Sequence, residues 1–76
     1  MNLLDLGERI RTLRKERGMT QAELAKKAEI SRATLSKLEN GLIAQISVVT
    51  LAEILNALGY ELDIVPINPF ASENVE

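Results

Sequence analysis

A chain of 76 residues, 46% hydrophobic and 26% charged, has the composition of one small globular domain. It has no cysteine and no histidine, which excludes disulfides and argues against a metalloenzyme or a triad hydrolase; no metal and no other cofactor are expected. The net charge of −2 is unevenly spread: residues 1–41 hold all nine basic residues with six acidic ones, and residues 42–76 hold five acidic residues.

The first 28 residues predict two helices separated by a tight turn. Apolar residues recur at i, i+4 and i+7 from Leu6, which predicts an amphipathic helix over roughly residues 5–17 that ends at Gly18. The stretch TQAE at residues 20–23 has the form of a capping box, in which a threonine and a glutamate satisfy each other's backbone amides. It therefore starts a second helix over about residues 21–28.

Two further helices follow, each opened by a serine that can act as an N-cap. Ser31 opens a third helix, which ends at Asn40 and Gly41. Ser47 opens a fourth helix, whose apolar residues recur three or four positions apart until Gly59 ends it. In the loop between them, Leu42 and Ile46 are expected to pack beneath the fourth helix.

Residues 60–65 alternate apolar and polar side chains, which predicts a β-strand that stops at Pro66. A lone strand leaves its amides and carbonyls unpaired, so the simplest partner is the same strand of a second copy, related by a two-fold axis. Glu61 and Asp63 would then lie on the outer face. The residues expected to form the dimer are Tyr60, Leu62, Ile64 and Val65. The alternative is an extended tail that packs on its own domain.

The third helix divides into an apolar arc and a polar arc when it is wound at 100° per residue. The polar arc holds Arg32, Ala33, Ser36, Lys37 and Asn40. Arginine and lysine can bind the edge of guanine in the major groove, and alanine can contact a thymine methyl group. Serine and asparagine suit phosphate oxygens. This arc can therefore read DNA, although a solvated polar face would look the same.

Several short motifs occur in the order typical of a known family. These are TQxELA at residues 20–25, IS at residues 30–31 and LENG at residues 38–41. Together they resemble the helix-turn-helix of the phage-repressor/Cro (XRE-type) family. The resemblance implies an all-α, lambda-repressor-like domain of four to five helices in residues 1–58. The dimerising strand then occupies residues 59–67, and residues 68–76 form a flexible tail.

The same resemblance implies a function and its residues. The protein would be a sequence-specific regulator, a repressor or autorepressor, that binds double-stranded DNA at a palindromic operator as a homodimer. Arg14 and Glu39 match a family pair that forms a partly buried ion pair. The residues that would contact bases are Arg32, Ala33 and Lys37. Those that would contact the DNA backbone are Gln21, Ser31, Ser36 and Asn40. Glu29 stands where relatives often have glycine, which implies a strained turn if its φ is positive.

The C-terminal end, LGYELDI at residues 58–64, is similar to that of HipB-like antitoxins. This favours a second function, in which the chain neutralises a protein toxin and represses its own operon. No apolar run approaches the roughly 18 residues of a membrane span, so no membrane contact is expected. A cytoplasmic, nucleoid-associated location is expected. An enzyme is the weakest alternative, because the carboxylates of Glu61 and Asp63 have no base or nucleophile beside them.

Overall fold

The computed structural model describes residues 3–42, 44 and 46–67 and contains four helices in that part of the chain. Their bounds are α1 Leu3–Glu16, α2 Gln21–Ala28, α3 Arg32–Glu39 and α4 Val48–Ala57. The predicted all-α helix-turn-helix fold is confirmed, with boundaries close to those that the caps and glycines indicated. The expected tail over residues 68–76 lies outside the described residues.

The start and end of each helix follow from local chemistry. The side chains of Thr20, Ser31 and Ser47 each accept a hydrogen bond from a first-turn amide of α2, α3 or α4, as N-caps do. Gly18 and Gly59 have positive φ just after α1 and α4, where an L-residue would be strained. Short-range signals therefore determine where the helices stop and how the chain turns between them.

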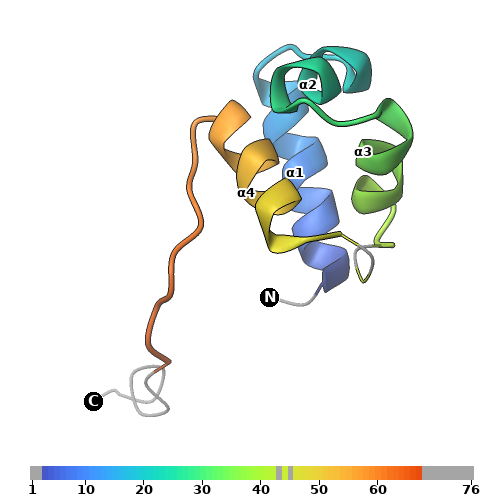
Figure 1. The fold of residues 1–76 in the computed structure, drawn as a ribbon. Helices are drawn as coiled ribbons and strands as arrows, with labels where there is room; N and C mark the ends of the chain where they lie inside the picture. Colours follow the sequence, from blue (N-terminus) through green and yellow to red (C-terminus); the bar gives the residue numbers. More distant parts are fainter. Residues whose placement is uncertain (1–2, 43, 45, 68–76) are drawn as a thin grey trace.

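The helices enclose one small hydrophobic core. α2 contacts both α3 and α4, and α1 contacts α3, so that every helix touches a neighbour (Figure 1). The largest fully buried side chains are Ile10, Leu24, Leu35, Leu38, Ile54 and Leu58. Ile46 packs against this core as expected. The expectation for Leu42 was wrong, because 63% of this residue is exposed at the end of the turn after α3.

Residues 60–67 leave the end of α4 as an extended segment that runs away from the helices (Figure 1). Within the residues that the structure describes, this segment pairs with no other strand. A β-strand is assigned by its hydrogen bonds to a neighbouring strand, and here the expected neighbour belongs to a second chain. The strand and the dimer that it would form therefore stay predictions. Tyr60 and Leu62 are partly covered by the domain, whereas Ile64 is 94% exposed.

Candidate nucleic-acid interface

The exposed face of α3 carries the residues that the sequence assigned to base contact. Arg32, Ala33 and Lys37 are exposed, and within the described part of the chain the side chains of Arg32 and Lys37 make no hydrogen bond or ion pair. On the opposite side of the same helix, Leu35 and Leu38 are fully buried in the core. The helix is therefore anchored on one side and offers two unengaged cations beside a small residue on the other.

Ser31 precedes this helix as its N-cap. Its hydroxyl oxygen accepts the Thr34 amide at 3.0 Å and lies 2.8 Å from the Thr34 hydroxyl. The side chain is thus already engaged in stabilising the first turn of α3. Ser36 lies one turn further on and is half-buried.

The carboxylate of Glu39, at the end of α3, is the centre of a buried polar network. It accepts two hydrogen bonds from Arg14, from Nε at 2.7 Å and from Nη2 at 3.1 Å. The Glu39 side chain is fully buried and that of Arg14 is 9% exposed. The structure thus brings the sequence-predicted pair together between α1 and α3, with the bidentate geometry typical of arginine and carboxylate.

The ionisation of this pair is set by its neighbours. Burial alone would raise the pKa of Glu39, but hydrogen bonds from Arg14, Gln21 and Arg11, together with the charge of Arg14, bring the pKa below its ordinary value. The hydrogen bond to Glu39 raises the pKa of Arg14 further above its ordinary value. Both groups are therefore charged at neutral pH, and the end of α3 is tied to α1 by a desolvated ion pair.

Gln21 connects this network to the start of α2. Its side-chain amide donates to Glu39 Oε1 at 3.1 Å. Gln21 is also the first residue of α2, directly after the capping box in which Thr20 and Glu23 bind each other's amides. The free amides at a helix N-terminus carry partial positive charge and bind anions well. Gln21 is therefore held where α2 can present this end to a phosphate.

The structure reveals a further member of the network that the sequence reading did not single out. Arg11 donates from Nη2 to Asn40 Oδ1 at 3.0 Å and from Nε to Glu39 Oε1 at 3.4 Å. Because Asn40 accepts through its oxygen, its amide NH₂ stays available as a donor toward solvent. One feature of the sequence could have indicated Arg11 as a member of the network: it lies three residues before Arg14 and hence on the same face of α1.

Gly7 is a second residue whose importance the sequence did not show. It is buried where α1 crosses the end of α3, and a Cβ at this position would overlap the carbonyl oxygen of Leu38. The missing side chain lets the two helices approach closely enough for Arg14 to reach Glu39. A glycine inside a helix otherwise destabilises it, so its place here has a packing reason.

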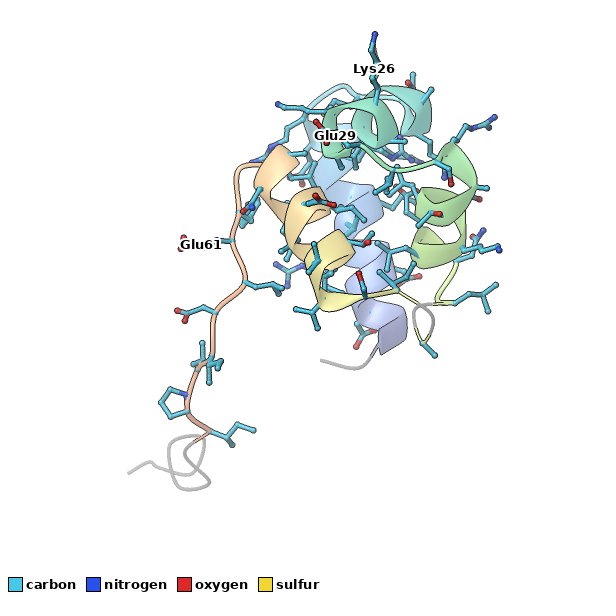
Figure 2. The ribbon with its side chains drawn as sticks, in the orientation of Figure 1. Lys26, Glu29 and Glu61 are labelled. Carbon is cyan, nitrogen blue, oxygen red and sulfur yellow. The ribbon has the colours of Figure 1, made fainter. Side chains whose placement is uncertain are left out.

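Charges outside the network lie on other parts of the surface. Lys26 projects into solvent from α2, Glu29 occupies the turn before α3, and Glu61 points away from the helices (Figure 2). Glu29 has φ 60°, so the condition for a strained turn at this non-glycine position is met. Among the described residues, no group of three or more His, Cys, Asp or Glu side chains could hold a metal ion. Nor does this part of the chain contain a helix long and apolar enough to cross a bilayer.

Sequence comparisons identify relatives of this arrangement. A family described as helix-turn-helix matches residues 10–65. A Mycobacterium tuberculosis protein named antitoxin HigA2 is 43% identical over 56 residues, which are 74% of this chain and 55% of that protein. The immunity repressor protein of Bacillus phage phi105 is 39% identical over 59 residues, 78% of this chain and 40% of that protein. The chain thus spans about half the length of these relatives.

Solved structures share the fold. A chain of the HipA-HipB-O2-O3 complex superposes with a TM-score of 0.78 and 29% identity, over 90% of this chain and 94% of that one. SinR, the master regulator for biofilm formation, has been solved in complex with DNA and superposes with a TM-score of 0.66. It is 34% identical over 72% of this chain and 87% of its own.

Proposed function

The chain belongs to the helix-turn-helix family, and from that premise we propose that it is a sequence-specific DNA-binding regulator that represses transcription, including that of its own gene. One observation carries the proposal: α3 presents an exposed polar face while hydrogen bonds to Glu39 tie the helix to α1 and α2. The relative named as an immunity repressor and the DNA complex of SinR support it.

In this proposal α3 enters the major groove, about 12 Å wide, and its exposed residues divide into two groups. Arg32 and Lys37 bind base edges, and Ala33 contacts a thymine methyl group. Residues at the start of α2 and along and beside α3 bind phosphates and fix the register of the protein on the duplex. These are Gln21, Ser31, Ser36 and Asn40. Ser31 contributes mainly by capping α3, since its hydroxyl is already engaged with Thr34.

The operator is proposed to be palindromic and the protein a homodimer. Two recognition helices about 34 Å apart can address successive major grooves on one face of the duplex. The extended segment after α4 supplies the contact between the subunits through Tyr60, Leu62, Ile64 and Val65. Val49, which is 68% exposed on α4, extends this apolar surface.

Catalysis forms no part of the proposed function. The site residues are arranged as hydrogen-bond donors and a structural ion pair, with no nucleophile beside a general base among the described residues. Because the target is chromosomal DNA, we place the protein in the cytoplasm, associated with the nucleoid. It requires no cofactor there.

The experiment that tests this function is capture of fragmented genomic DNA by the purified protein at near-physiological salt, followed by sequencing of the bound fragments. We expect enrichment of an inverted repeat whose half-sites lie about one helical turn apart. Enrichment of the chain's own promoter would support autorepression. Recovery of random fragments would contradict sequence-specific binding.

Substitutions on α3 test the assignment of its residues. Arg32→Ala and Lys37→Ala should each weaken operator binding by about 1–3 kcal/mol and relax the preference at particular base pairs. Lys26→Ala is the matched control, because this exposed lysine projects from α2 without contacting the network (Figure 2). The measurement is the dissociation constant on a set of operators with single base-pair changes. Equal weakening on every operator would reassign the residue to a phosphate contact.

A second function is favoured by two of the relatives. HigA2 is named an antitoxin, and HipB-type structure is found in a complex with HipA. In this alternative the chain is an antitoxin that holds a protein toxin and represses its own operon. Coexpression with a toxin-like neighbouring gene tests this alternative, with cell growth as the measurement. Rescue of growth by a variant that has lost DNA binding would separate the two activities.

A further inference from the structure

The segment of residues 60–67, called the arm below, is the most exposed apolar part of the described chain. Ile64 is 94% exposed, Val65 72% and Ile67 92%. Its first half is less exposed: the exposed fraction is 46% for Tyr60 and 41% for Leu62. An apolar stretch left this open in a small domain needs another surface to cover it.

The root of the arm is fixed. The amide of Tyr60 donates to the Leu55 carbonyl at 2.8 Å, which closes the end of α4. The guanidinium of Arg17 lies over the Tyr60 ring, 5.2 Å from its centre, in cation–π contact. The arm therefore leaves the domain in a defined direction, with its tip remote from its root (Figure 1).

A groove of about 560 Å³ opens beside this root. Met19 and Ala57 contribute apolar surface to its wall, and Arg17 and Lys27 contribute positive charge. The arm of the same chain cannot fill this groove, because the arm runs away from it toward the opposite end of α4 (Figure 1). The occupant must therefore approach from outside the chain.

If two arms pair around a two-fold axis, the pairing determines which residues of the second chain reach the groove. The two-fold axis of an antiparallel pair runs perpendicular to the ribbon, so each residue points to the same face in both strands. Residues directly opposite each other also share one face, so the numbers of each opposed pair sum to an even value. The register with the most apolar pairs places Leu62 opposite its own copy and Tyr60 opposite the partner's Ile64. The ladder cannot continue past Gly59, because Ala57 belongs to α4 and Gly59 has positive φ. The same register therefore leaves the partner's Val65 and Ile67 beside the root of the arm, where Ala57 and Gly59 line the groove.

We propose that this groove is the receptor for the arm tip of a second copy, Val65-Pro66-Ile67, so that two subunits exchange arm tips around a self-pairing Leu62. The inference rests on the dimer of the proposed function and specifies its register and its second contact. Pro66 has no amide hydrogen, so the ladder ends before it and the tip is free to leave the two-stranded ribbon. The tip itself is uncharged, as the apolar wall of the groove requires. The arm's acidic residues, Glu61 and Asp63, precede the tip and lie opposite each other in this register, near the positive charge of Arg17 at the root.

The absence of cysteine makes the register directly testable by cross-linking. Opposed residues of an antiparallel pair have Cα atoms about 4.5–5.5 Å apart, which is within the range for a disulfide. Leu62→Cys should therefore form a covalent dimer under mild oxidation. Ile64→Cys is the matched control: it should stay monomeric on denaturing gels by itself and cross-link only when mixed with Tyr60→Cys.

The groove contact is tested with a mixture of two single variants, Ala57→Cys and Ile67→Cys, in the full chain. We expect a disulfide-linked heterodimer from this mixture and none from Thr12→Cys with Ile67→Cys, because Thr12 lies on a different surface of α1. As a second measurement, Ile67→Asp should raise the dimer dissociation constant at least about tenfold in sedimentation experiments, through lost apolar burial.

The outcomes separate the groove from the function on which it rests. Cross-linking at Leu62 without cross-linking between Ala57 and Ile67, and with an unchanged dissociation constant for Ile67→Asp, would overturn the groove contact and leave the dimer intact. Cross-linking of Ile64→Cys to itself would overturn the register. A wild-type chain that stays monomeric while it binds its operator would overturn both the groove contact and the proposed dimer, but not the DNA binding.

Discussion

Replacing Glu39 by glutamine tests whether the buried network holds the recognition helix. Glu39 accepts hydrogen bonds from Arg14, Gln21 and Arg11, and its side chain is fully buried. Glutamine has nearly the same shape but no charge, and one of its two terminal groups donates rather than accepts. In Glu39→Gln, the Arg14 guanidinium would therefore stay buried without a counter-charge and would face an amide donor.

The size of the effect follows from the geometry of the pair. Removal of one partner from a buried, hydrogen-bonded ion pair destabilises a protein by about 3–5 kcal/mol. A domain of this length has a free energy of unfolding on the order of 4–11 kcal/mol, from about 0.05–0.15 kcal/mol per residue. Glu39→Gln should thus remove a large part of the total stability. The double variant Arg14→Met with Glu39→Leu should recover much of it, because neither buried charge remains.

Urea unfolding at a fixed protein concentration measures this loss, since dimerisation would make stability concentration-dependent. Glu23→Gln is the matched control: Glu23 binds the Thr20 amide on the exposed surface, and glutamine can accept the same hydrogen bond. We expect it to change stability by less than about 0.5 kcal/mol. A loss below about 1 kcal/mol for Glu39→Gln would refute the reasoning, because the pair would then behave like a surface ion pair.

Three further outcomes are expected. Because the pKa of Glu39 is lowered in the folded chain, its stabilisation is present above the ordinary pKa of 4.5 and lost as the pH falls through the lowered value. The urea midpoints of the wild type and Glu39→Gln should therefore converge in acid and separate at neutral pH. Gly7→Ala should lower the free energy of unfolding by about 1–3 kcal/mol through overlap with the Leu38 carbonyl, measured by urea unfolding; a gain, the usual result of this change in a helix, would contradict the close approach. Glu29→Gly should raise the melting temperature by several degrees, because relief of the strain at φ 60° adds up to about 1 kcal/mol to the free energy of unfolding. The control Lys27→Gly, inside α2, should lower the melting temperature.

The parts of the fold that the sequence predicted are those set by neighbouring residues. Thr20 with Glu23, Ser31 and Ser47 are caps whose partners lie three residues away, so the helix starts could be read directly. Gly18 and Gly59 marked the ends in the same way, by their tolerance of positive φ. The polar arc of α3 followed from helical periodicity alone, and its residues are exposed as expected.

The parts that the sequence missed depend on which helices cross. Arg11 binds Asn40, which is 29 positions further along the sequence. Gly7 contacts the end of α3, which is at a similar distance along the sequence. Neither contact leaves a local pattern, because only the crossing of α1 over α3 brings the partners together. Arg14 and Glu39 are 25 positions apart, and the prediction of this pair rested on a family resemblance. Leu42 was misassigned because an apolar residue in a short loop has no periodicity that indicates a face.

Stability and DNA recognition are coupled in this domain through one side chain. The bond from Arg14 to Glu39 joins α1 to α3 and stabilises the fold. Through its bonds with Gln21 and Arg11, Glu39 also orients groups that are proposed to contact phosphates. A change at Glu39 therefore acts on folding and on binding together. Arg32 and Lys37 make no hydrogen bond or ion pair within the described residues, so changes there act on binding alone. Because most surface substitutions alter stability by less than about 0.5 kcal/mol, α3 can change its preferred bases without loss of the fold.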